Sequence, residues 1–136
     1  MVSIMASGKG TGKTKKIIEM ANAKLKSCSG NIIFIDDDKR HMLDINHDIR
    51  FMSMDEFPFK KADEFISFLY GMIANNYDTK TIYIDGLMKV AEVDVNEIPS
   101  FVDKLEEIGK AYDVEIITTL SLKESNVPSE VSKYLM

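Results

Sequence analysis

The chain has little cysteine, proline and arginine, and no long apolar run. One cysteine in 136 residues excludes a disulfide framework and is typical of the reducing cytoplasm. No segment approaches the length of a membrane span. The first apolar run begins at residue 2, which leaves no room for a secretory leader. We therefore expect a cytoplasmic protein that has no membrane-spanning segment.

The three prolines fall at boundaries between apolar patterns, and no repeat, linker or low-complexity tract is visible. We expect one domain over residues 1–136, long enough to bury a core without a disulfide or structural metal. The net charge of −5 argues against broad electrostatic binding to nucleic acid, so a nucleic-acid partner is not expected.

Short apolar runs alternate with helical patterns along the chain. The runs cover residues 2–6, 31–36, 80–85 and 114–120, and the helical patterns cover residues 13–28, 62–75 and 98–112. This alternation is typical of parallel strands with helical crossovers. It predicts an α/β fold, a three-layer α/β/α sandwich around a mainly parallel sheet of four or five strands.

Three further features of this pattern can be tested against the structure. Residues 49–54 are a candidate additional edge strand, and residues 128–135 a candidate terminal helix. Each predicted helix also carries an apolar stripe, and we expect the aromatic side chains of these stripes in the core rather than in a base-stacking platform. The stripes contain Ile17, Ala21, Leu25 and Cys28 in the first helix, Phe65, Phe68, Leu69 and Met72 in the second, and Phe101, Leu105, Ile108 and Tyr112 in the third.

Directly after the first apolar run comes a glycine- and lysine-rich segment that matches most of the phosphate-binding (Walker A) pattern G-x-x-x-x-G-K-[ST]. It consists of Ser7, Gly8, Lys9, Gly10, Thr11, Gly12, Lys13 and Thr14. Glycines let successive backbone N–H groups point at phosphate oxygens, and the positive end of a helix dipole favours the negative charge. Lys13 would reach the β- and γ-phosphates, and the Thr14 hydroxyl would bind Mg²⁺.

The segment departs from the pattern at one position, because Ser7 stands where the first glycine belongs. The alternative interpretation is a turn that only caps a helix. A strand before and a helix after the segment are the context that the phosphate-binding loop requires, and both are predicted here. We therefore expect residues 7–14 to bind ATP or ADP.

Carboxylates follow two of the predicted strands, where open α/β sheets bind ligands. Asp85 ends the run 80–85 and resembles the magnesium-binding aspartate of the Walker B pattern. Three consecutive acids end the run 31–36, and Asp38 or Asp37 is the candidate for orienting the water that attacks the γ-phosphate. A surface aspartate at the first position and a solvated charged loop at the second are the alternatives.

Together these features resemble the P-loop NTPase superfamily and, within it, the RecA-like ATPase cores. The resemblance implies a catalytic acid at the end of the second strand. It also implies a polar γ-phosphate sensor after the fourth strand, for which Thr118, Thr119 and Ser121 are the candidates. In these cores the fourth strand lies between the first and third. That order leaves the first strand near a sheet edge, and an edge needs cover from the terminal helix or from a second subunit. We therefore expect a homo-oligomer.

Other positions argue against rapid turnover. Gly86 follows Asp85 where many relatives carry a catalytic glutamate, and Arg40 and Arg50 are the only arginines that could stabilise transition-state charge. The leading hypothesis is a weak Mg²⁺-dependent ATPase. A nucleotide-gated binding module without significant turnover, read by an unknown protein partner, is the first alternative. A phosphotransferase acting on a small acceptor, with residues 40–57 as a lid, is the second. His41 and His47 are interpreted as loop histidines.

Overall fold

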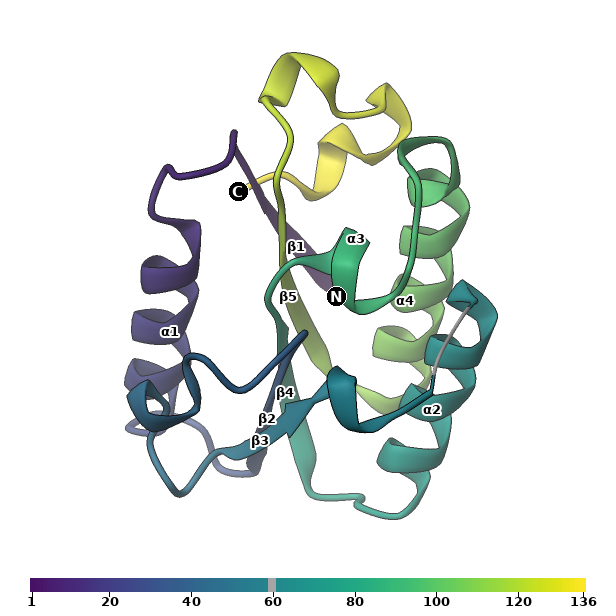
Figure 1. Ribbon diagram of the computed structural model, residues 1–136. Coiled ribbons are helices and arrows are strands. Elements are labelled where there is room, and N and C mark those ends of the chain that lie inside the picture. Colours follow the sequence, from purple (N-terminus) through teal and green to yellow (C-terminus); the bar gives the residue numbers. More distant parts are fainter. Residues whose placement is uncertain (59–60) are drawn as a thin grey trace.

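The computed structural model describes residues 1–58 and 61–136 and shows an α/β protein with a five-stranded, fully parallel sheet. The strands are β1 (Val2–Ala6), β2 (Asn31–Asp36), β3 (Arg50–Ser53), β4 (Thr79–Ile84) and β5 (Glu115–Leu120). They lie in the order β1-β5-β4-β2-β3 (Figure 1). The predictions of an α/β class and of a mainly parallel sheet are confirmed.

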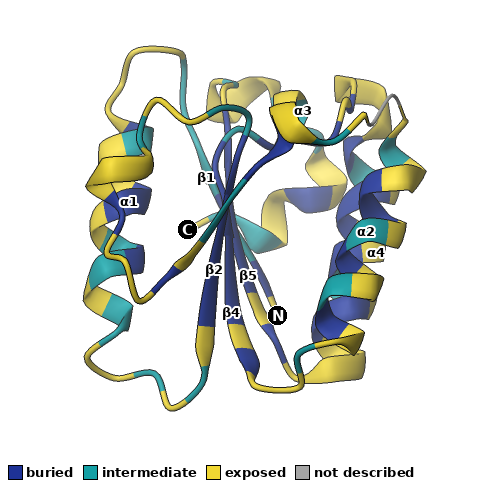
Figure 2. Ribbon diagram, turned by 60° about the horizontal axis from the view of Figure 1, so that its bottom comes forward, coloured by how far each residue is buried: buried dark blue, intermediate teal, exposed yellow. Residues whose placement is uncertain are grey.

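Helices cover both faces of this sheet and give the molecule three layers. Helix α1 (Lys13–Lys24) lies on one face, and α2 (Ala62–Ala74) and α4 (Ile98–Tyr112) lie on the other (Figure 1). Alternate side chains of β2 serve the two faces: Ile33 and Ile35 pack in the core with α2 and α4, whereas Phe34 packs in the core with α1. Figure 2 shows the buried faces of the helices turned toward the sheet. None of the described helices is both long and apolar enough to cross a membrane.

A short helix, α3 (Leu87–Val90), follows β4 and was not predicted from the sequence. It begins after Gly86, whose φ of 78° lies in the left-handed region that favours glycine. Because α3 has only four residues, it is too short to produce a periodic apolar pattern. It brings Met88 and Lys89 to the carboxyl ends of the strands, where both line a cavity.

Both edges of the sheet agree with the expectations. Strand β3 pairs with β2 as the predicted edge strand, and β5 lies between β1 and β4, which leaves β1 at the other edge. The predicted terminal helix is a 3₁₀ helix over Ser129–Tyr134 with Val131 buried. Beyond it, Leu135 forms a parallel bridge with Ile4, and the Met136 N–H donates to the Ile4 carbonyl over 2.9 Å. The chain's own terminal segment thus covers part of the β1 edge, and the homo-oligomer stays a prediction.

Some details differ from the prediction. Helix α1 ends at Lys24 rather than at residue 28, because the chain enters a turn at residues 25–27. Tyr112 is not a core residue: it is the last residue of α4, 37% exposed, and its ring meets that of Tyr70 edge-on at 6.1 Å. The stretch 40–57, considered as a lid, contains β3 and two 3₁₀ turns (Met42–Asp44 and Met54–Glu56).

Candidate functional site

A cavity of about 590 Å³ lies where the carboxyl ends of the strands meet. Because all five strands run parallel, the residues that follow each strand lie at the same end of the sheet, the end formed by the carboxyl ends of the strands. The cavity is lined by the segment from Lys9 to Thr14, by the residues that follow β2, β4 and β5, and by α3. A volume of this size lies within the range of about 300–1,000 Å³ that is typical of small-molecule sites.

The glycine-rich loop forms one wall of the cavity. Gly10 and Gly12 have φ values of 75° and 87°, and Gly12 is the residue that precedes the first turn of α1. A side chain at either position would strain the backbone, so glycine is required by the local conformation. The loop is closed by the Thr11 hydroxyl, which donates to the Gly8 carbonyl over 2.7 Å and also contacts the Ser7 hydroxyl. Ser7 therefore has a role in this loop that a glycine could not supply.

Lys13 is the first residue of α1, and its side chain folds back over the loop. Its ammonium group donates to the carbonyls of Ser7 and Gly8 at 2.9 and 2.8 Å, and the residue is only 9% exposed. Burial lowers the pKa of the Lys13 ammonium, and the nearby Asp85 carboxylate opposes this effect. The loop thus holds a poorly solvated cation at the cavity wall.

Asp85 lies at the end of β4, 7% exposed, and it is fixed by a neighbour on β5. The Thr119 hydroxyl donates to Asp85 Oδ1 over 2.8 Å and accepts a hydrogen bond from the Gly86 N–H over 2.7 Å. Thr119 and Ser121 both line the cavity. Thr118 is fully buried and donates to the Ile84 carbonyl, so of the three polar residues proposed as γ-phosphate sensors it is the one absent from the described lining.

The three acids after β2 lie in different environments. Asp36 is 3% exposed; its Oδ1 accepts from the Asp37 N–H, and its Oδ2 has no hydrogen-bond partner among the described residues. Burial above all, a hydrogen bond with Asp37 and the carboxylate of Asp85 raise the pKa of Asp36 to about 8. The raised pKa favours the protonated form of Asp36 at neutral pH.

Asp38 faces Arg40 instead of the cavity. Arg40 Nε donates to both carboxylate oxygens at 3.0 and 3.1 Å, and the Arg40 N–H donates to Oδ1 at 2.9 Å. These hydrogen bonds hold the pKa of Asp38 below its usual range. Asp37 and Arg40 line the cavity, and Asp38 is absent from the lining that the described residues form. Of the two carboxylates that the sequence left open, Asp37 is thus the one at the cavity.

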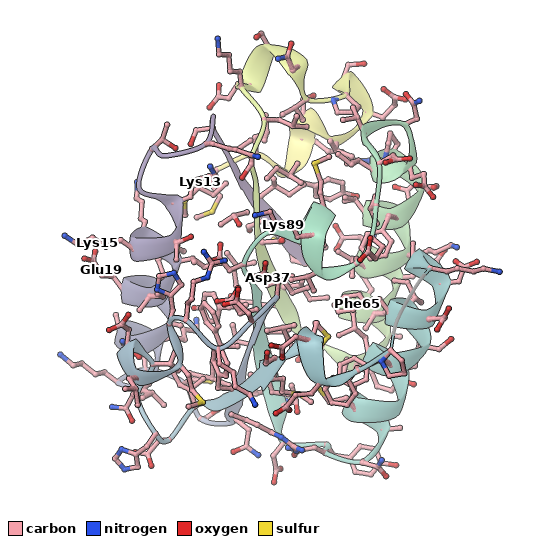
Figure 3. The ribbon with its side chains drawn as sticks, in the orientation of Figure 1. Lys13, Lys15, Glu19, Asp37, Phe65 and Lys89 are labelled. Carbon is pink, nitrogen blue, oxygen red and sulfur yellow. The ribbon has the colours of Figure 1, made fainter. Side chains whose placement is uncertain are left out.

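Sequence reasoning missed Lys89 and assigned His41 to an ordinary loop, yet both line the cavity. Lys89 comes from α3 and lies near Lys13 and Asp37 in Figure 3, between α1 and α3. The only signal for it in the sequence is its position four residues after Asp85. That signal becomes informative only once α3 is known to turn back over the strand ends.

The cavity combines both signs of charge. Four basic side chains (Lys9, Lys13, Arg40 and Lys89) and three carboxylic acids (Asp36, Asp37 and Asp85) line it. The four basic groups outnumber the three acids even when all the acids are ionised, and the raised pKa of Asp36 widens this difference at neutral pH. This balance suits an anion whose charge exceeds that of a single carboxylate.

The oxygen-bearing side chains of the cavity could supply some of the ligands of a magnesium ion, if a bound anion supplied others. Among the described residues no group of three His, Cys, Asp or Glu side chains could hold a metal by itself. The Thr14 hydroxyl and the Asp85 carboxylate line the same cavity, and the unpartnered Oδ2 of Asp36 is a further oxygen nearby. Mg²⁺ prefers such oxygen ligands and takes its remaining ones from water and phosphates.

Comparison with protein-family models finds no match, and comparison with curated proteins finds no significant match.

Proposed function

We propose that the protein binds ATP with Mg²⁺ and hydrolyses it slowly, and that its fold is a minimal RecA-like core of the P-loop NTPase type. The observation that carries the proposal is the position of Lys13. It is the first residue of a helix, it follows a loop that contains the two left-handed glycines Gly10 and Gly12, and it lines the same cavity as Asp85. The position of β5 between β1 and β4 also supports it, because RecA-like cores have this strand order.

The loop would bind the phosphates through its backbone N–H groups and through the amino-terminal end of α1. Lys13 would exchange the carbonyls of Ser7 and Gly8 for phosphate oxygens, which offer its ammonium full negative charges. Thr14 and Asp85 would hold the magnesium ion, which neutralises charge on the transferring phosphoryl group when bound.

Asp37 is the residue best placed to orient or deprotonate the attacking water, because it lines the cavity whereas Asp38 is held by Arg40. Thr119 and Ser121 would contact the γ-phosphate. Turnover is expected to be slow for two reasons: residue 86 is a glycine, and Arg40 must leave Asp38 before it can stabilise charge on the phosphate. Nucleotide binding without turnover is therefore the second candidate, in which a protein partner reads the bound state.

Lys13→Ala tests the proposal directly. Mg²⁺-ATP at 100 times its dissociation constant should stabilise the wild-type protein by about 2.7 kcal/mol and raise its melting temperature by roughly 8–12 °C. The variant should lose this shift and the release of phosphate. Lys15→Ala is the matched control, since Lys15 lies on the outer side of α1 (Figure 3). Equal phosphate release by Lys13→Ala would contradict the ATPase proposal, and no shift with any nucleotide would contradict nucleotide binding.

A further inference from the structure

A second cavity, of about 530 Å³, adjoins the first. The two share three residues, Asp37, Met88 and Lys89, so the carboxylate proposed to activate water lines both. The rest of the second cavity comes from residues that follow β3 and from the end of α3 and the turn after it. A ligand in the second cavity would therefore lie beside a phosphate group in the first.

The two cavities differ in charge. The second has one basic side chain, Lys89, and three carboxylates, those of Asp37, Asp55 and Glu92. Apolar groups, among them Met54 and Val90, complete the lining. A triphosphate would be repelled from this cavity, whereas a small molecule with a positive charge and an apolar part would be attracted to it.

We propose that the second cavity binds the acceptor of a phosphoryl group, and that this acceptor is a small alcohol that carries an ammonium group. The inference rests on the proposed nucleotide site, because the γ-phosphate must lie in the first cavity. Asp55 and Glu92 would pair with the ammonium group, and the hydroxyl would point at Asp37. The absence of a carboxylate at position 86 fits this assignment, since a phosphotransferase needs its base beside the acceptor rather than beside a bound water.

The transfer step balances without a further reactant. The acceptor oxygen attacks the γ-phosphorus and forms a new P–O bond, while the bond from that phosphorus to the bridging oxygen of the β-phosphate breaks. The broken bond's electron pair leaves on ADP, and the hydroxyl proton passes to the Asp37 carboxylate, a role that aspartate plays in protein kinases. Lys89, which lines both cavities, would stabilise the charge between donor and acceptor. The products are ADP and a phosphomonoester.

The test uses the full chain with Mg²⁺ and ATP labelled at the γ-phosphate. Glucosamine and ethanolamine are offered as acceptors, and glucose and ethylene glycol serve as the matched neutral alcohols. We expect at least one ammonium alcohol to receive the label at least tenfold faster than its neutral counterpart. With Mg²⁺-ADP bound, that alcohol should also shift the methyl resonance of Met54, which lines the second cavity, and leave that of Met136, which lines a different one, unchanged.

Glu92→Gln should raise the acceptor KM at least tenfold while ATP affinity and ATP hydrolysis stay unchanged. Asp113→Asn is the control: Glu92 and Asp113 are both acidic residues with a φ of 55°, but Asp113 lies at the end of α4 and is absent from the described lining of both cavities. Transfer to neither ammonium alcohol while Mg²⁺-ATP still binds would overturn the acceptor proposal alone. Equal transfer to the neutral alcohols would overturn the acceptor class, and transfer without a shift of Met54 would overturn the location. If the wild-type protein does not bind Mg²⁺-ATP, the proposed function is overturned, and the acceptor proposal with it.

Discussion

Three ionisable side chains at the first cavity are poorly solvated, and each is accommodated in a different way. Lys13 satisfies its ammonium group with two loop carbonyls, and Asp36 escapes the cost of a buried charge by holding a proton. Asp85 keeps one oxygen bonded to Thr119. Each of these arrangements would change if a phosphate and a cation entered the cavity, as the proposed function requires.

The raised pKa of Asp36 predicts how stability depends on pH. The pKa is about 8 in the folded protein and near 3.8 in the unfolded chain, so unfolding releases a proton between those values. Stability should therefore fall as the pH rises from about 4 to about 8. Asp36→Asn removes this contribution, so the free energy of unfolding of the variant relative to wild type should rise across that range by several kcal/mol, up to about 6 kcal/mol for a pKa shift of this size.

Urea unfolding at several pH values without nucleotide or Mg²⁺ measures this difference. Asp103→Asn, on the exposed side of α4, should follow the wild-type curve. A constant difference between Asp36→Asn and wild type from pH 4 to pH 8 would show that folding does not raise the pKa of Asp36.

The sequence predicted which residues meet at the first cavity better than it predicted their individual environments. The loop and Asp85 could be named because their types and spacing follow directly from phosphate and magnesium chemistry. The choice between Asp37 and Asp38 could not be made, because it depends on how Arg40 divides its guanidinium between them: Nε donates to Asp38, and Nη2 lies 3.9 Å from Asp37. Lys89 was missed because its proximity to the loop arises from a turn of α3 that leaves no periodic signal.

Among the elements, the long ones were predicted well because their cores impose a period. The bounds of α4 were predicted as they are, and β1 and β2 match residue for residue. Helix α1 ends four residues early, where three turn hydrogen bonds, one to the Ala23 carbonyl and two to the Lys24 carbonyl, begin the loop into β2. Apolar residues continue past that point and still pack on the core, so the pattern alone overestimated the length of the helix.

Two helical glycines offer a matched test of how closely the elements pack. A Cβ atom at Gly109 in α4 would lie 2.8 Å from the Met1 nitrogen and 2.9 Å from the Val114 carbonyl oxygen. A Cβ atom at Gly71 in α2 would meet nothing within 4 Å. Gly109→Ala should therefore destabilise the protein by about 1–3 kcal/mol, whereas Gly71→Ala should stabilise it by up to about 1 kcal/mol. Thermal and urea unfolding of the two variants measure both changes, and equal effects would contradict the close approach of α4 to the sheet.

At the scale of the whole molecule, the two edges of the sheet are protected differently. Strand β3 is short, with four residues, and Arg50 at its start is exposed, both of which discourage edge pairing. Strand β1 has five residues and gains a partner in Leu135 and Met136. The terminal segment also buries Val131 in the core, so it is anchored both to β1 and to the core beneath the sheet.

Met136→Pro tests whether this segment protects the β1 edge. Proline removes the N–H that donates to the Ile4 carbonyl, and the preceding Leu135, at φ −66° and ψ 136°, already has a conformation that proline tolerates. Met136→Ala keeps the N–H and is the control. Relative to that control, the free energy of unfolding of Met136→Pro should be lower by about 0.5–1.5 kcal/mol. It should also self-associate more strongly in sedimentation velocity, because an uncovered strand edge pairs with another chain. If the two variants are equally stable and sediment alike, the bond to Ile4 does not protect the edge, and the remaining cover must come from the packing of the 3₁₀ helix Ser129–Tyr134.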